Sequence, residues 1–278
     1  MHARLTGALL RAAAQVSTLW VVLTLLLFAW LGRPLWQDPA ALASLAGFSW
    51  NPAAGQYGLG AMFAGTLLLS SGALVLAFPL GLLCTLFVLA LGPRALARPL
   101  RQVLTLMAGV PTIVYAFVAV WLLVPWLRDS AGVGMGFSWL AASLTLGLML
   151  VPTVALPLIG VLAPADAALA PSCDALGLRR VQRLLWVTLP AHKPLMLSVL
   201  LVAAGRAAGD TLIALMLSGN APWLPQSPAD PLRVLSAHIA LSLATDTEST
   251  AYAAIYASSL LLLAWVGFSH ALSRRLMR

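Results

Sequence analysis

Six long apolar stretches separated by short polar segments set the pattern of this chain. Each stretch is long enough to cross ~30 Å of hydrocarbon as a helix. They cover residues 16–31, 59–91, 103–126, 137–163, 195–218 and 251–272. The pattern therefore predicts an all-α, polytopic membrane protein with six transmembrane helices.

The first two stretches allow alternatives to a simple span. The first is followed by GRPLWQDP, which has no small-residue cleavage site, so it predicts a membrane span rather than a signal peptide. The second is longer than one crossing needs. Either Pro79 and Gly81 bend it, or its first residues form a turn outside the membrane.

Charge gives the expected orientation. Hydrophobic residues make up 61% of the chain and charged residues 9%, against about 25% charged in a soluble domain. The net charge of +8 comes from basic residues between the apolar stretches, so membrane topology explains it better than nucleic-acid binding. With both termini in the cytoplasm, the outside holds only Arg33, Arg128 and Arg233. The cytoplasmic side then holds Arg4, Arg11, Arg94, Arg98, Arg101, Arg179, Arg180, Arg183, Lys193, Arg274, Arg275 and Arg278.

Two predicted external segments are longer than simple turns. Residues 32–58 contain Trp36 and Trp50, and residues 220–250 contain Asp230, Asp246 and Glu248. They are either interfacial loops with aromatic anchors or a docking face for an external partner.

One arginine stands in the middle of an apolar stretch. Arg206 and Asp210 lie in LMLSVLLVAAGRAAGDTLIALMLSG, and Arg206 is the only Lys or Arg within such a stretch. A charge at this depth costs ~2.5–3.5 kcal/mol or more. On one continuous helix the two residues would share a face. They would form either an internal salt bridge or an anion site.

The anion reading has a specific chemistry. A guanidinium offers a planar fork of donors to an oxyanion. Asp210 would accept the proton that inorganic phosphate still carries near neutral pH, and would repel fully ionised sulfate. The Thr211 hydroxyl either adds a contact or bonds back to its own helix. Gly205 and Gly209 permit close helix packing, or else thin the wall beside the ion.

Residues 164–194 form the longest predicted cytoplasmic segment. From Ser172 onward it reads as an amphipathic helix with Leu176, Val181, Leu184, Leu185 and Thr188 on one face, stopped by Pro190. The arginines lie mostly elsewhere. Periodicity alone leaves two readings, a helix on anionic lipid or a contact for a partner protein.

Several motifs resemble one family. Ala175, Leu176 and Gly177, followed by Leu189 and Pro190, resemble the EAA loop of binding-protein-dependent ABC importer permeases. GRAAGDTLIALMLSGNAP resembles the GRAxGET stretch of phosphate-specific (Pst-type) permeases, and AGVPTIVYAFVAV and GTLLLSSGALVLAFPLGLLCTLFVLA resemble their third and second spans. The resemblance covers residues 61–272. Pro171, Ser172 and Cys173 replace the family's Glu-Ala-Ala, and Asp210 replaces its membrane glutamate.

The resemblance implies a type I ABC importer (MetI-like) permease fold. Residues 59–274 would form the ABC transmembrane type-1 domain, preceded by a helix and external loop in residues 1–58. The implied partners are an ATPase subunit dimer, a second homologous permease, an extracytoplasmic phosphate-binding protein and membrane lipid. The implied contacts with the ATPase are Asp174, Ala175, Leu176, Gly177, Arg179, Leu189 and Pro190.

Other chemistry is missing from the sequence. No Walker A pattern is present, and the only lysine, Lys193, lies in AHKP. His2, His192, His238 and His270 are scattered, and Cys84 and Cys173 have no metal-ligand spacing. We therefore expect a chain that is not an enzyme and holds no cofactor or metal, with ATP and Mg bound by the partner ATPase.

The expected function is passage of inorganic phosphate across the bacterial inner membrane as part of an ATP-driven importer. Three rivals remain open. One is an ABC permease for molybdate, tungstate or sulfate. The others are a secondary transporter driven by an ion gradient and a structural scaffold that would tolerate loss of Arg206.

Overall fold

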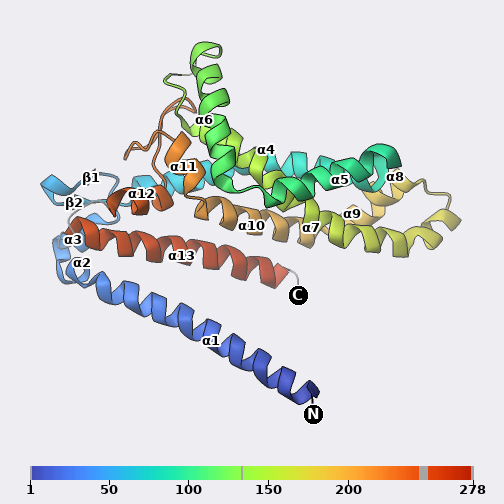
Figure 1. Cartoon of the computed structure of the whole chain (residues 1–278), viewed down its shortest axis with the longest axis horizontal. Coiled ribbons are helices and arrows are strands. Elements are labelled where there is room, and N and C mark those ends of the chain that lie inside the picture. Colours follow the sequence, from blue (N-terminus) through green and yellow to red (C-terminus); the bar gives the residue numbers. More distant parts are fainter. Residues whose placement is uncertain (1, 133, 244–249, 277–278) are drawn as a thin grey trace.

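The computed structural model describes residues 2–132, 134–243 and 250–276. Figure 1 shows an elongated helical bundle with small elements gathered at one end. Five described helices are long and apolar enough to cross a membrane, and a bent pair, Arg180–Ala191 and Lys193–Gly209, raises the number to six. The prediction of an all-α protein with six spans is confirmed. The long helices are α1 (His2–Leu31), α4 (Gly60–Leu86), α6 (Thr112–Asp129), α7 (Trp139–Ala175), α10 (Lys193–Gly209) and α13 (Thr250–Leu276).

The second span is one long unit. Helix α4 passes through Pro79 without a break and continues into η2 (Phe87–Leu91), a π-helical turn. It packs along α7, and the approach is closest at small residues. A Cβ on Gly81 would lie 2.7 Å from the Cγ1 of Val154, so a larger residue there would push the two helices apart.

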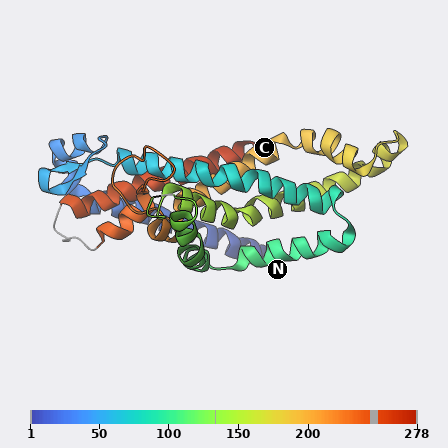
Figure 2. The same ribbon diagram turned by 90° about the horizontal axis from the view of Figure 1, so that it is seen from above.

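The third predicted span is broken, which corrects the expectation of one helix over residues 103–126. Helix α5 (Arg94–Gly109) ends before Val110 and Pro111, whose extended backbone (ψ 128° and 140°) separates it from α6. Pro111 disfavours a helical conformation at Val110. In Figures 1 and 2 α5 runs beside the bundle, whereas α6 turns away from it.

The core divides into three buried clusters. One joins α4, α6, α7 and α11 (Leu212–Leu217), and a second joins α4, α5, α7 and α10. The third lies at the end of the bundle that carries the predicted external segments, and includes Leu35, Met62 and Leu235. Helix α1 contributes little to these clusters. It contacts α13 at one end, where the rings of Phe28 and Tyr256 are 5.8 Å apart.

The predicted external segments are folded rather than open loops. The first forms α2 (Arg33–Gln37), α3 (Pro39–Ser44), η1 (Pro52–Ala54) and the antiparallel strands β1 (Trp50–Asn51) and β2 (Gln56–Tyr57). In the second, the Asp230 carboxylate accepts N–H bonds from Gln226 and Ser227 at 2.8 Å, and these bonds lower its pKa. Asp246 and Glu248 lie outside the described residues.

A buried histidine joins the two external segments. His238, on α12 (Leu235–Ser242), is fully buried, and its ring meets Trp50 edge-on at 4.3 Å. Burial, and next the charge of Arg233, lower the pKa of His238 to about 4, so the ring is neutral at neutral pH. Its neighbours indicate a packing role, and no group of metal-ligating side chains occurs among the described residues.

Candidate functional site

Two of the predicted spans are interrupted, and the two interruptions lie close together. The first break separates α5 from α6, and the second lies between α10, which ends at Gly209, and α11. Helices α6 and α11 pack against each other, so the two breaks are neighbours. Irregular backbone at membrane depth is tolerated where it is buried in protein or lines a water-filled path. This junction is therefore a candidate for part of an ion pathway.

Asp210 lies in the second break, which corrects the prediction that it shares a helical face with Arg206. Its backbone is extended (φ −73°, ψ 119°). One carboxylate oxygen, Oδ1, accepts the N–H of Ile213 at 3.0 Å and so caps α11, while the Asp210 carbonyl accepts a bond from the Ser236 hydroxyl. The side chain of Thr112, at the start of α6, lies beside the same carboxylate.

Arg206 is exposed in the last turn of α10. Its charge is close enough to act on Asp210, yet no ion pair joins the two side chains in the part of the chain that the structure describes. The alternative of an internal salt bridge is therefore not supported. The Arg206 side chain is exposed, and the Asp210 carboxylate accepts the bond from Ile213 with Thr112 beside it.

Thr211, Gly205 and Gly209, which were also predicted near this site, have different environments. Thr211 is half-buried, and its carbonyl accepts the N–H of Leu215 at 2.8 Å. A Cβ on Gly205 would touch His270 of α13 at 3.5 Å, which agrees with close packing there. Gly209 has no atom within 4 Å of the same position, so the packing explanation does not hold for it.

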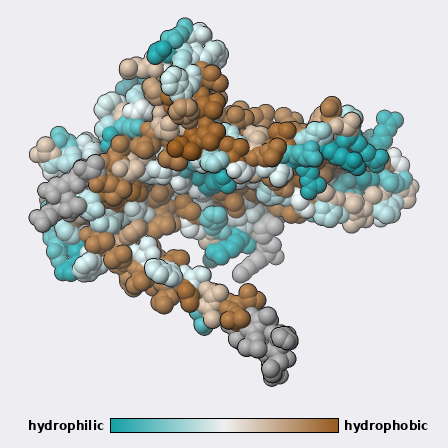
Figure 3. All heavy atoms as spheres, in the orientation of Figure 1, coloured by the Kyte–Doolittle hydropathy of each residue, from teal (hydrophilic) through white to brown (hydrophobic). Residues whose placement is uncertain are grey.

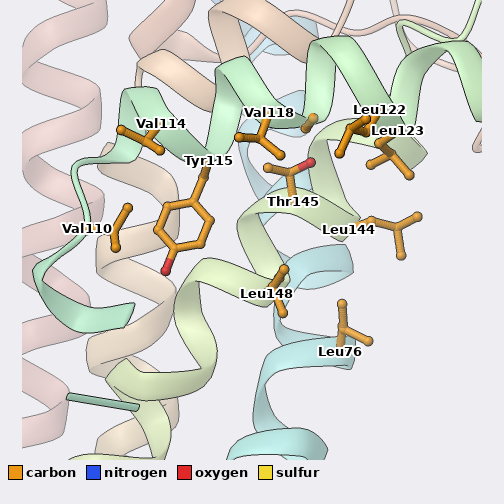
Figure 4. Close-up of a pocket in the computed structure, with 11 residues that line it drawn as sticks. Leu76, Val110, Val114, Tyr115, Val118, Leu122, Leu123, Leu144, Thr145 and Leu148 are labelled. Atoms are coloured by element: carbon orange, nitrogen blue, oxygen red, sulfur yellow. The ribbon is translucent and has the colours of Figure 1, made fainter. Parts of the chain in front are cut away.

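A neighbouring cavity has the wrong chemistry for an anion. It measures about 560 Å³ between α4, α6 and α7, and Figure 4 shows its mostly aliphatic lining. Its two hydroxyls are already engaged, since Tyr115 donates to the carbonyl of Met107 and Thr145 to that of Ala141. The cavity therefore fits hydrocarbon or an apolar side chain.

The predicted ATPase-contact segment has a turn where a helix was expected. Helix α7 continues to Ala175, and the chain then turns at Gly177, whose φ is +74°. It resumes as α8 (Arg180–Gln182), η3 (Arg183–Thr188) and α9 (Leu189–Ala191). The prediction of one helix from Ser172 to Pro190 is wrong, because the left-handed backbone at Gly177 ends α7. Pro190 falls in the first turn of α9, where proline is tolerated.

The buried face of this segment also differs from the prediction. Leu184 and Thr188 are buried as expected, but Leu176 is 78% exposed and Leu185 is exposed. Arg183, which was placed largely off the apolar face, is only 7% exposed. The segment therefore turns an arginine inward.

Arg183 is held by two aspartates. Its Nε and Nη2 donate to the two carboxylate oxygens of Asp166 at 3.1 and 3.0 Å, and its Nη1 donates to Asp174 at 2.9 Å. The Thr188 hydroxyl donates to Asp166 at 2.9 Å. Because Asp166 lies on α7, this ion cluster fastens the segment after the turn to the end of α7. Helical periodicity gave no sign of it, since Asp166 and Arg183 are 17 positions apart.

The outward surface of the segment is apolar and basic. Leu176, Arg179, Arg180, Trp186 and Pro190 are all exposed. Leu189 is half-buried, and Ala175 is exposed at the last position of α7. Asp174, the single acid in the predicted contact set, is bonded to Arg183 through one oxygen but remains 64% exposed. This surface offers contacts to either a protein groove or anionic lipid.

No protein-family model matches the chain. Among curated relatives, the probable ABC transporter permease YqgH of Bacillus subtilis is 29% identical over 205 residues, which span 73% of this chain and 66% of YqgH. The phosphate transport system permease PstC of Mesorhizobium japonicum is 26% identical over 289 residues, which span 95% of this chain and 86% of PstC.

Solved structures carry the same architecture. A bacterial ABC transporter involved in the import of alginate contains a chain with a TM-score of 0.55 and 17% identity, covering 96% of this chain and all of that one. The chain has the fold of an ABC importer permease. It is thus a multi-pass membrane protein with relatives among the phosphate permeases named PstC, which agrees with the family inferred from its motifs.

The ion cluster yields a first prediction. Asp166→Asn removes the charge that neutralises a buried guanidinium, and we expect it to lower the free energy of unfolding by ~3 kcal/mol. The matched control is Asp174→Asn, which removes a carboxylate from the same arginine but at an exposed position, with an expected loss of at most ~1 kcal/mol. Thermal unfolding of the purified protein in detergent measures both. A loss for Asp166→Asn as small as that of the control would show that Asp166 does not hold the segment.

Proposed function

We propose that this chain is a membrane subunit of an ATP-driven importer and passes inorganic phosphate into the cell. Its relation to PstC permeases over 95% of its length carries the proposal. The junction of the two broken spans supports it, since the half-buried Asp210 lies there beside Arg206, which forms no ion pair among the described residues. The YqgH, PstC and alginate proteins are named for transport, and none is named for a covalent reaction.

Arg206 and Asp210 take unequal roles in this proposal. Arg206 attracts the anion with a fork of N–H donors. Asp210 is fixed by its bond to Ile213, so its second oxygen has a defined position from which to accept the proton of a phosphate ion. Sulfate carries no proton near neutral pH and meets Asp210 as a like charge. Thr112 belongs to the same site, and Thr211 follows Asp210 in the break.

Energy would reach the site through the cytoplasmic segment. The sequence has no P-loop, so a partner ATPase would bind ATP and Mg and dock on residues 174–190. The ion cluster would carry movement of that segment into α7, whose other end packs beside α6 and α11. A second permease subunit and an extracytoplasmic phosphate-binding protein complete the proposed assembly. This chain itself needs no cofactor.

The proposed orientation places both termini in the cytoplasm, with residues 59–274 as the transport domain and residues 1–58 as an added helix and external segment. The basic residues favour it. Arg94, Arg98, Arg101 and Arg179 would all lie on the cytoplasmic side. Arg183 no longer counts as a solvated charge, and Arg278 lies outside the described residues.

Thiol labelling tests the orientation. In a background with Cys84 and Cys173 replaced by Ala, an impermeant reagent should label Ser130→Cys in intact cells. Ser172 is exposed near the C-terminal end of α7. The Ser172→Cys variant should react only after the membrane is made permeable. The reverse result would mean that the chain has the opposite orientation.

Uptake competition tests the transported ion. In cells that depend on this system, unlabelled phosphate should suppress uptake of labelled phosphate, while equal sulfate or molybdate should have little effect. Uptake should stop when the partner ATPase is inactivated. Stronger competition by another oxyanion would reassign the substrate, and uptake that survives loss of the ATPase would indicate a secondary transporter.

Two conservative variants test the site. Arg206→Lys keeps the charge but loses the planar fork, so phosphate flux per assembled complex should fall ~10-fold or more. Asp210→Asn keeps a good helix cap and should assemble normally, but should weaken discrimination between phosphate and sulfate. The measurement is flux of each anion in proteoliposomes. Wild-type flux and preference in both variants would remove these residues from the pathway.

A further inference from the structure

Helix α5 carries a stripe of cationic and polar side chains on one face. Arg98, Arg101, Gln102 and Thr105 follow the helical spacing i, i+3, i+4 and i+7, and all four are exposed. The adjoining face packs inward through Ala97, Leu100 and Leu104. Figure 3 shows hydrophilic side chains toward the end of the molecule where α5 and α8 lie, and hydrophobic ones over α6.

The stripe is hollowed. Arg98, Arg101, Gln102, Thr105 and Leu106 line a hollow of about 600 Å³. In the described part of the chain, neither guanidinium takes part in an ion pair. The Thr105 hydroxyl donates to the carbonyl of Arg101 at 2.9 Å, so toward the hollow it offers an acceptor. The hollow thus combines two guanidiniums and an amide with one acceptor, and no carboxylate lines it.

The stripe lies at the edge of the buried core. Leu104, one turn after Arg101, belongs to the buried cluster that includes Leu158 of α7 and Leu184 of η3. The exposed guanidinium of Arg101 therefore lies beside apolar packing, where its charge is stabilised by water, an anion or a partner charge.

The stripe also leads away from the junction of the broken spans. Helix α5 ends at Gly109, and Thr112, just past the break, lies beside Asp210. From there α5 runs back toward the cytoplasmic segment, as Figure 1 shows. An anion released from Arg206 would therefore meet Arg101 and then Arg98.

We infer that this hollow is a second oxyanion site, through which the transported phosphate leaves toward the cytoplasm. The identity of the ion rests on the proposed function. A lipid headgroup has the same phosphate chemistry, but the continuity of the stripe with the junction favours the passing ion. Because the hollow has no carboxylate, it does not select phosphate over sulfate. It raises the rate of passage, and selection stays at Asp210.

The test uses the assembled transporter in proteoliposomes. Arg98→Gln combined with Arg101→Gln should reduce phosphate flux per complex ~10-fold, since each change removes a charge-assisted contact. The preference for phosphate over sulfate should not change, in contrast to Asp210→Asn. The matched control is Arg94→Gln, which removes one charge from the same helix outside the hollow and should keep wild-type flux.

Two lipid mixtures separate the two phosphate sources. The loss of flux should be equal in vesicles of phosphatidylcholine alone and in vesicles that also contain phosphatidylglycerol. A loss seen only with phosphatidylglycerol would assign the arginines to lipid and overturn the inference. Wild-type flux in the double variant would overturn it as well.

A second measurement does not depend on transport. With Cys84 and Cys173 replaced by Ala, Thr105→Cys in the assembled transporter is modified from the cytoplasmic side by a charged thiol reagent. Phosphate should slow this modification relative to chloride at equal ionic strength. If phosphate, sulfate and molybdate all fail to protect, the hollow is not an oxyanion site, whatever the transporter carries. Protection by these anions in a complex that does not transport phosphate would leave the site standing and refute the proposed function.

Discussion

Backbone polar groups within hydrocarbon must find their partners in the protein, and this requirement shapes the centre of the structure. The break after Gly209 frees N–H and C=O groups that a continuous helix would have paired. The Asp210 carboxylate accepts the N–H of Ile213, and the Ser236 hydroxyl donates to the Asp210 carbonyl, so two of these backbone groups are paired. The Asp210 side chain therefore satisfies part of the backbone at the break and also lies beside Thr112 of α6.

The sequence predicted the spans well because their signal is simple apolar length. It failed at the breaks, although local signals existed. Gly209 is a helix terminator, and Asp210 followed by Thr211 is a common helix start, yet both were read as the interior of one apolar stretch. Likewise Pro111 after Gly109 marks the end of α5. Hydropathy averages over such positions, so an interrupted span and an intact one look alike.

The segment of residues 164–194 shows a different limit. Its apolar positions were read from periodicity, which treats every arginine as solvated. Arg183 is buried because Asp166 and Asp174 neutralise it, and neither pairing follows from helical spacing. Gly177 of the Ala-Leu-Gly motif adopts a backbone that favours glycine, yet the motif was read as part of one continuous helix. What it could not give was the path of the chain on either side.

The ion cluster constrains which substitutions this protein can accept during evolution. Asp166 and Arg183 depend on each other, while Thr188 bonds to the same carboxylate. Substitution of only one of the two residues leaves the other as a buried, unpaired charge. Homologues should therefore either keep both residues or replace both. Paired replacement at these positions across distant homologues would then be a record of their contact. The exposed arginines beside them, Arg179 and Arg180, form no ion pair within the described chain, although the charge of Arg180 also acts on Asp166.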